Sequence, residues 1–293
     1  MSAPRHVVAL LTLGLIVIGI SPLLIRFAGD TPALAIAAWR TMFVAVIMLP
    51  IAWTTKREEI QQLTRREWGL VGAAGVFLSG HFMMWIGSVQ LTTVASASVL
   101  VAMAPVFIAI LGALFLRERP TRRTTLAILA AVFGAVLIGI GEASPRETAL
   151  PNPMLGNALA LTAALLVSVY LLIGRSVRQR TSFVTYFALL STVAALTTLA
   201  TCLALGVELI HPLPMLGLFL LMGLGPGLLG HGSFNLALAY FSAAFLGLLS
   251  LAEPVIATFG ALVLFKEVPS ALTLVGAVIV LAAIATVVRG DRA

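Results

Sequence analysis

The chain has 293 residues, of which 60% are hydrophobic and 10% are charged, and its formal net charge is +7. Its mean hydropathy is +1.11, whereas soluble domains are roughly 45–50% apolar and about 25% charged. This composition excludes a soluble domain and predicts a membrane protein whose excess basic residues contact anionic lipid headgroups and not nucleic acid.

Ten apolar runs follow one another along the chain, and about 20 apolar residues suffice for a helix to cross a bilayer. They cover residues 6–25, 33–53, 69–90, 94–116, 124–141, 154–174, 182–205, 214–236, 242–265 and 271–288. The first run lacks a small-x-small exit and is not interpreted as a cleaved signal peptide. The sequence therefore predicts an all-α integral membrane protein of ten transmembrane helices, with no separate soluble domain.

One stretch of the chain occurs twice. Residues 105–120 read PVFIAILGALFLRERP and return at 254–269 as PVIATFGALVLFKEVP, an interval of 149 residues. Residues 21–26 and 170–175 match at the same interval, and Gly80-His81 recurs as Gly230-His231 at an interval of 150. We interpret these matches as an internal duplication, with residues 1–145 as the first five-helix repeat and residues 146–293 as the second.

The basic residues predict the orientation of these helices. With a cytoplasmic N-terminus, all but Arg26, Arg40, Arg146 and Lys266 of the 18 Lys and Arg residues fall on the inner side, as the positive-inside rule requires. Both termini are then cytoplasmic. Because each repeat has an odd number of helices, the second enters the membrane upside down. Inverted repeats are typical of secondary transporters with a site near the bilayer midplane.

Ten helices in two fives, with Pro-Val…Gly-Ala-Leu…Glu-x-Pro in the fourth and ninth, resemble the drug/metabolite transporter superfamily and its EamA-type members. The resemblance spans the whole chain and implies two inverted five-helix repeats around a central cavity between helices 1, 3, 4, 6, 8 and 9. It implies export of amino acids or related metabolites across the bacterial inner membrane. The chain also resembles aromatic amino-acid exporters, although no particular residue carries this narrower match.

Ionisable groups inside a membrane are costly, so each is a candidate for function. His81, Trp85 and Ser88 share one face of the third run, and His231 with Asn235 occupies the related part of the eighth. An imidazole and an indole suit a zwitterionic, partly aromatic solute. The alternative is that each histidine only bonds a carbonyl of a neighbouring helix.

Glu253 precedes Pro254 in the ninth run, and we expect it to be buried at a helix kink, where it can take up a proton or hold a cationic group. Its counterpart in the first repeat is Ala104. Arg40 lies near the outer end of the second run, and the simplest expectation is that it snorkels outward beside Trp39. The alternative is a charge pair with Glu253 or with a substrate carboxylate.

Ser21 and Tyr170 occupy matching repeat positions, and both should line the cavity if the repeats enclose it. For Tyr170 the alternative is a position in the inner aromatic belt. The expected hinges are the prolines, and Gly225-Pro226-Gly227 is expected to break the eighth helix; the proline positions are Pro22, Pro105, Pro226 and Pro254. Gly72, Gly75, Gly276 and Ala277 are interpreted as helix-packing positions.

Enzymatic motifs are missing from the sequence. No phosphate loop, His-Glu-x-x-His or Gly-x-Ser-x-Gly is present, and the single cysteine, Cys202, predicts neither a disulfide nor a metal cluster. We therefore expect a transporter without catalytic residues, metal or cofactor, whose partners are a small solute and the bilayer. Its oligomeric state stays open, with a monomer as the simplest case. The alternatives are an exporter of cationic drugs, nucleobases or sugar phosphates, a membrane-embedded lipid-modifying enzyme, and a non-transporting partner or channel.

Overall fold

The computed structural model describes residues 3–92, 94–117, 119–142, 152–266 and 268–290, and every regular element in these ranges is helical. The proposed repeat boundary at residues 145 and 146, Arg146, and both motif glutamates, Glu118 and Glu267, lie outside the described residues.

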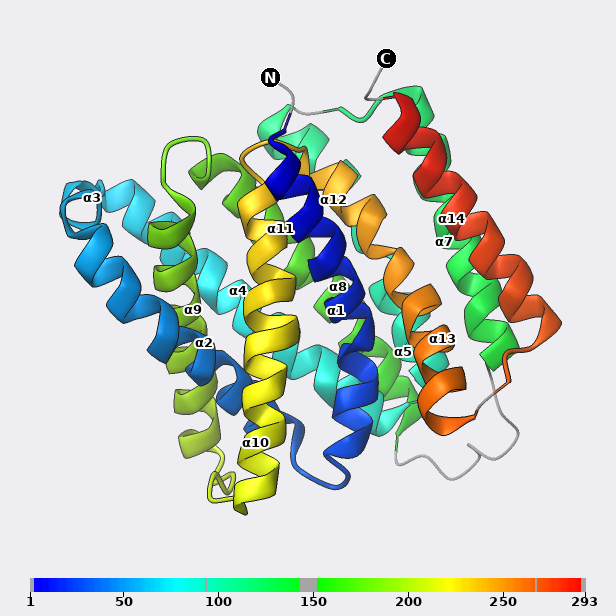
Figure 1. The fold of residues 1–293 in the computed structure, drawn as a ribbon, viewed down its shortest axis with the longest axis horizontal. Helices are drawn as coiled ribbons and strands as arrows, with labels where there is room; N and C mark the ends of the chain where they lie inside the picture. Colours follow the sequence, from blue (N-terminus) through cyan, green and yellow to red (C-terminus); the bar gives the residue numbers. More distant parts are fainter. Residues whose placement is uncertain (1–2, 93, 118, 143–151, 267, 291–293) are drawn as a thin grey trace.

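The helices form one bundle, with the start of α1 and the end of α14 at the same face (Figure 1). Their bounds are α1 Arg5–Phe27, α2 Ala33–Thr55, α3 Arg57–Gln62, α4 Arg65–Leu91, α5 Val94–Val101, α6 Ala104–Leu111, η1 Gly112–Leu116, α7 Arg122–Glu142, α8 Pro153–Val177, α9 Phe183–Ala204, α10 Leu213–Met222, η3 Gly223–His231, α11 Gly232–Ala237, α12 Ala243–Ser250, α13 Ala252–Phe265 and α14 Ala271–Gly290. When helices that directly follow one another are counted as one span, the described ranges contain ten apolar spans of 18 to 27 residues. The prediction of ten transmembrane helices is confirmed.

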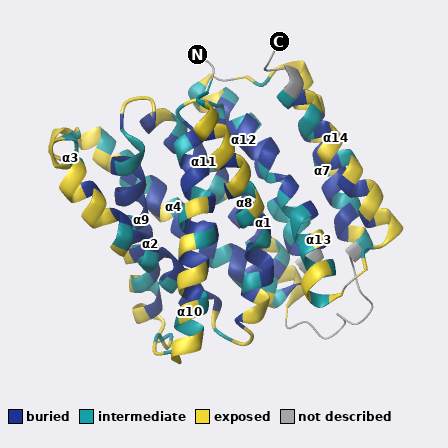
Figure 2. Ribbon diagram, in the orientation of Figure 1, coloured by how far each residue is buried: buried dark blue, intermediate teal, exposed yellow. Residues whose placement is uncertain are grey.

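Exposed residues lie along the helices of the bundle (Figure 2), and many of them are large hydrophobic residues. Leu114 is 69% exposed and Phe115 is 76% exposed although both lie inside a span. In water such side chains would be driven inward, so the surrounding medium of these helices is lipid. The chain is a multi-pass membrane protein.

Polar side chains mark where several helices begin. Thr64 accepts a hydrogen bond from the Glu67 backbone N–H at 3.2 Å, and the Glu67 carboxylate accepts one from the Thr64 N–H at 2.8 Å. This capping box fixes the start of α4. Ser182 and Ser242 cap α9 and α12 in a similar way. Such caps satisfy N–H groups that the helix itself leaves without acceptors.

Helix pairing brings the two halves of the chain together. Helix α2 packs on α9 and α7 packs on α14, while α4 packs on α8 and α1 packs on η3 and α13. Glycines allow the closest approaches: a β-carbon at Gly134 would lie 2.8 Å from the carbonyl oxygen of Gly276. The fold is therefore held together by contacts between halves more than within either one.

Two spans are interrupted at related places. In one, α5 ends at Val101 and α6 begins at Ala104; in the other, α12 ends at Ser250 and α13 begins at Ala252. Both spans then end at a basic residue in the left-handed region, Arg117 with φ 58° and Lys266 with φ 60°. A basic side chain suits the negative end of a helix dipole. These interruptions lie just before Pro105 and Pro254, where the sequence analysis expects kinks.

The eighth span departs from the expectation of a break. The backbone stays helical through Pro226 but widens to π-helical geometry over Gly223–His231. A π-helix leaves out the hydrogen bond that proline cannot make and keeps the neighbouring ones, so the helix continues. Pro226 is therefore the site of a widening, and the prediction that it interrupts the helix is wrong.

Gly75 and Gly72 give a matched test of helix packing. A β-carbon at Gly75 would lie 2.6 Å from Val193 Cβ, whereas one at Gly72 would have no atom within 4 Å, so the packing role expected for Gly72 is wrong. We expect Gly75→Ala to lower the free energy of unfolding by about 1–3 kcal/mol. Gly72→Ala should be neutral or stabilising by up to ~1 kcal/mol, because alanine favours helix. Thermal unfolding of the purified variants in detergent measures this, and equal shifts would contradict the packing.

Candidate functional site

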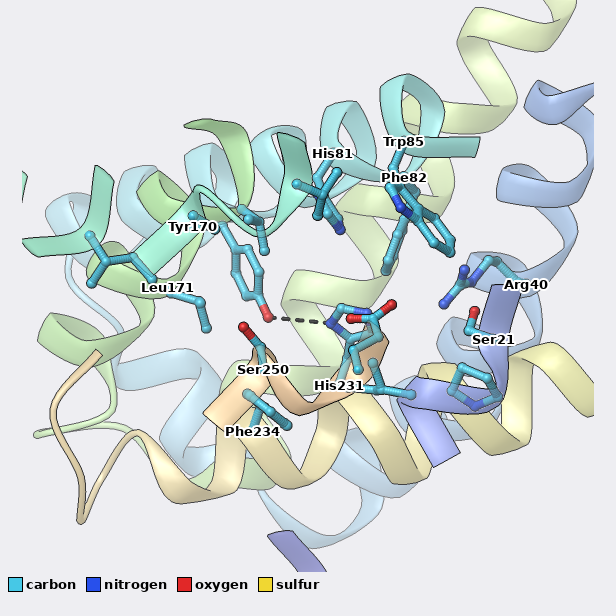
Figure 3. A pocket seen from close by; sticks show the side chains of 17 residues that line it. Ser21, Arg40, His81, Phe82, Trp85, Tyr170, Leu171, His231, Phe234 and Ser250 are labelled. Atoms are coloured by element: carbon cyan, nitrogen blue, oxygen red, sulfur yellow. Dashed lines mark hydrogen bonds between the residues drawn. The ribbon is translucent and has the colours of Figure 1, made fainter. Parts of the chain in front are cut away.

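A cavity of ≈ 70 Å³, here called the larger cavity, lies between the halves of the bundle (Figure 3). Its lining residues are Ile18, Ser21, Arg40, His81, Phe82, Trp85, Val101, Ala104, Ile108, Val167, Tyr170, Leu171, Pro226, His231, Phe234, Ser250 and Glu253. Most of the sequence-predicted site residues are thus brought together. The volume is enough for several water molecules, so a larger occupant requires the helices to separate.

The lining shows the same interval as the duplicated sequence. Six separate pairs of lining residues are 149 or 150 positions apart, namely Ile18 with Val167, Ser21 with Tyr170, His81 with His231, Trp85 with Phe234, Val101 with Ser250 and Ala104 with Glu253. The expectation that Ser21 and Tyr170 both line one cavity is met. His81 and His231 are the same residue type, but Ser21 differs from Tyr170, Val101 from Ser250 and Ala104 from Glu253, so the polar groups are distributed unequally between the two halves of the lining.

His81 is buried on α4, and its Nδ1 lies 3.0 Å from the carbonyl oxygen of Ala163 on α8. A carbonyl oxygen only accepts hydrogen bonds, so Nδ1 carries the proton and donates it. In the neutral ring Nε2 is then the unprotonated nitrogen. Nδ1 of His81 therefore bonds a neighbouring helix, which is the alternative that the sequence left open. Its Nε2 is an acceptor in a residue that lines the cavity.

His231 contacts side chains and not a neighbouring carbonyl. Its Nδ1 lies 3.4 Å from the Tyr170 hydroxyl (Figure 3), and its ring meets the Phe82 ring edge-on with centroids 4.9 Å apart. The rings of His81 and His231 are 6.3 Å apart. Tyr170 is 1% exposed and is a wall residue of the cavity, so its alternative assignment to an aromatic belt is wrong.

Arg40 is the clearest correction to the sequence analysis. It is 2% exposed and does not snorkel outward. It lies seven residues inside α2, about 10 Å along the axis, which is too deep for an easy exit along a packed helix. Its guanidinium carbon lies 4.2 Å from the centroid of the Phe82 ring. Nε and Nη1 are buried without a hydrogen-bond partner, so the group retains donors for an anion.

Glu253 lies ten residues from Ala243 and twelve from Phe265, the two ends of its span. It is thus near the middle of its span, just after the helix interruption at Leu251, and its side chain is half-buried where the sequence analysis expects burial. It lines the larger cavity together with Arg40, yet among the described residues no ion pair joins the two side chains. Two opposite charges therefore face one cavity without neutralising each other directly.

The remaining predicted residues divide into three groups. Ser88 donates to the Trp85 carbonyl, and Asn235 donates to the His231 carbonyl, so both support lining residues from behind. Pro105 packs near Gly247 and lines neither of the two cavities discussed here. Pro22 and Pro254 line a second, smaller cavity. The described residues contain no group of three or more His, Cys, Asp or Glu side chains placed to hold a metal.

The sequence analysis missed Phe82 and Ser250. Phe82 lies three residues before Trp85, a spacing that places both on one side of α4, but its contact with Arg40 could be found only from the position of α2. Two features of the sequence could have indicated that Ser250 belongs to the site. It lies three residues before Glu253, and it lies one repeat interval after Val101. Either could have placed it beside the carboxylate.

The chain is similar to known transporters over its whole length. The model of the EamA-like transporter family matches it twice, over residues 6–140 and 154–289. A protein of Archaeoglobus fulgidus described as an uncharacterized transporter is 26% identical over 271 residues, which cover 88% of this chain and 87% of that protein. A solved crystal structure, 18% identical, covers 99% of both chains with a TM-score of 0.80 and so shares the fold.

Two variants of His81 test whether the hydrogen bond from Nδ1 to the Ala163 carbonyl stabilises the fold. The amide of His81→Asn can replace Nδ1 and donate to Ala163, whereas His81→Ala leaves that bond unmade. We expect His81→Ala to lower the free energy of unfolding by about 1 kcal/mol more than His81→Asn, as thermal unfolding would show. If both variants were equally stable, the bond to Ala163 would have no structural role.

Proposed function

Because the chain belongs to the EamA-like transporter family, we propose that this membrane transporter exports amino acids or related small metabolites through the larger cavity. The observation that carries the proposal is the pair of unjoined charges, Arg40 and Glu253, in one buried cavity. Burying a charge without a partner costs several kcal/mol. A solute that carries both charges offsets this cost for both side chains at once.

An amino acid meets these requirements. Its carboxylate can accept hydrogen bonds from the unpartnered Nε and Nη1 of Arg40, and its ammonium group can face Glu253. Apolar side chains such as Trp85, Phe234 and Ile108 form the rest of the wall and suit an apolar or aromatic side chain of the solute.

The other solutes considered fit less well. An organic cation is attracted by Glu253 but repelled by Arg40, while a sugar phosphate meets the reverse situation. In a cavity of low dielectric such like-charge contacts cost several kcal/mol. Nucleobases, being uncharged, would leave both buried charges without partners.

Alternating access between two inverted repeats is the proposed mechanism. Three observations support it: the family model matches each half separately, the helix interruptions and left-handed caps recur in both halves, and lining residues come in pairs at the repeat interval. Five spans in each half would make equivalent helices run in opposite directions. Such a pair of halves can exchange conformations and so open the same site to either side.

We also propose a bacterial inner membrane location with both termini in the cytoplasm. The start of α1 and the end of α14 lie at one face (Figure 1), and the positive-inside rule assigns that face to the cytoplasm.

The test is efflux from proteoliposomes loaded with labelled aromatic or aliphatic amino acids, with and without an imposed pH gradient. We expect efflux of one class of amino acid. The amine and the acid analogues, each lacking one charge, should compete at least about tenfold more weakly. Arg40→Gln should weaken the acid analogue but not the amine, and Glu253→Gln the reverse, each by at least about tenfold.

Arg180→Gln provides the matched control, because Arg180 is an exposed arginine in the connection between α8 and α9 and should transport normally. Efflux of no amino acid by the folded protein would refute the assigned solute class and direct the search to other metabolites. Equal losses for both analogues in each variant would refute the two charge assignments.

A further inference from the structure

Glu253 borders a second space. A smaller cavity of ≈ 30 Å³ is lined by Glu253, Ser98, Val101 and Ser250, among other residues, and shares Glu253, Val101 and Ser250 with the larger cavity. Glu253 is the one charged side chain in its described lining. The space is enough for a water molecule or an ion of similar size, and too small for an amino acid.

Two backbone carbonyls at this cavity lack their usual partners. In a helix the carbonyls of Val101 and Ser250 would accept from the N–H groups four residues later, but Pro105 and Pro254 occupy those positions and have no N–H. In the described parts of the chain no other hydrogen bond to either carbonyl is recorded. A carbonyl that lacks its usual helix partner is unusual, and here the two residues that carry one both line the same cavity.

Two serines with hydroxyl groups also line the smaller cavity. Ser250 Oγ donates to the Gly247 carbonyl at 2.7 Å, so its lone pairs remain available as acceptors, and Ser98 also lines the cavity. The residues that line this cavity therefore include one with a carboxylate, two with carbonyls that lack their helix partners and two with hydroxyl groups. Hard cations prefer such all-oxygen sites, and one carboxylate balances one positive charge.

We propose that the smaller cavity binds a sodium ion, held by Glu253, the freed carbonyls of Val101 and Ser250, and the Ser98 hydroxyl. A proton would need only the carboxylate and would leave the neutral oxygens without a role. Interrupted helices supply carbonyl ligands for coupling ions in other transporters, and in this chain the interruption occurs in both halves.

A consequence follows that rests on the proposed function. Glu253 can neutralise the sodium ion or the ammonium group of the solute, but a single carboxylate does not balance both. Binding of the two is then mutually exclusive, which is the requirement for exchange of an entering ion for a leaving solute. The groups that face Glu253 across the larger cavity are Arg40, His81, Tyr170 and His231.

The experiment measures thermal unfolding of the purified protein without solute, in sodium chloride and in N-methylglucamine chloride at equal ionic strength and pH. We expect sodium to raise Tm saturably, by about 2–4 °C. Ser98→Ala and Glu253→Gln should lower the apparent sodium affinity at least about tenfold. Pro105→Ala, which restores an N–H for the Val101 carbonyl, should also weaken it.

Two controls separate this site from the solute site. Ser79→Ala changes a buried serine that lines neither cavity and bonds only to Val76 of its own helix, and it should keep the full sodium response. Arg40→Gln should lose solute binding and keep the sodium response.

No sodium effect on wild-type protein would overturn the proposal, as would an unchanged response in Ser98→Ala and Glu253→Gln. Stabilisation by low pH alone, with nothing added by sodium, would overturn it in favour of a proton on Glu253. Amino-acid efflux without a sodium response refutes only the ion site. A sodium response that depends on Ser98, without efflux of any amino acid, supports the ion site and refutes the solute class.

Discussion

Lipid accepts and donates no hydrogen bonds, and this constraint governs the structure. Every polar group inside the bilayer needs a partner from the protein, an ion or a solute. Most of the chain meets the requirement with continuous helices. Several departures lie at or beside the two cavities: the interruptions before Pro105 and Pro254, the widened helix at Pro226, the buried Arg40 and the half-buried Glu253. These are the places where an external partner can be bound.

Equivalent positions in the two halves carry different chemistry. The backbone features agree closely, with the interruptions and the left-handed residues Arg117 and Lys266 at one interval. The side chains do not, since Ala104 faces Glu253 and Ser21 faces Tyr170 across the same cavity. A symmetric frame can exchange its conformations, while an asymmetric lining can hold a dipolar solute in one orientation. In the proposed mechanism, movement depends on the shared backbone features and recognition depends on the differing side chains.

Phe82 shows how recognition depends on contacts between helices. It lies under the Arg40 guanidinium and against the His231 ring, and so connects α2 with η3 through α4. A cation over an aromatic face is stabilised without using its N–H groups. Arg40 is therefore held in place while two of its nitrogens stay free for a carboxylate. A lysine would lose the planar donor geometry.

The sequence alone determined the ten helices, because a bilayer of fixed thickness requires a fixed length of apolar chain. It also indicated the interruptions before Pro105 and Pro254, because proline cannot donate, although the helices continue past Pro22 and Pro226. It also identified His81, His231, Tyr170 and Glu253, since polar residues in apolar runs are rare. Only the tertiary structure decided that Arg40 points inward, that Phe82 supports it and that His81 bonds Ala163. Helical periodicity gives the direction of a side chain around its own axis, whereas the neighbour it meets depends on how separate helices pack.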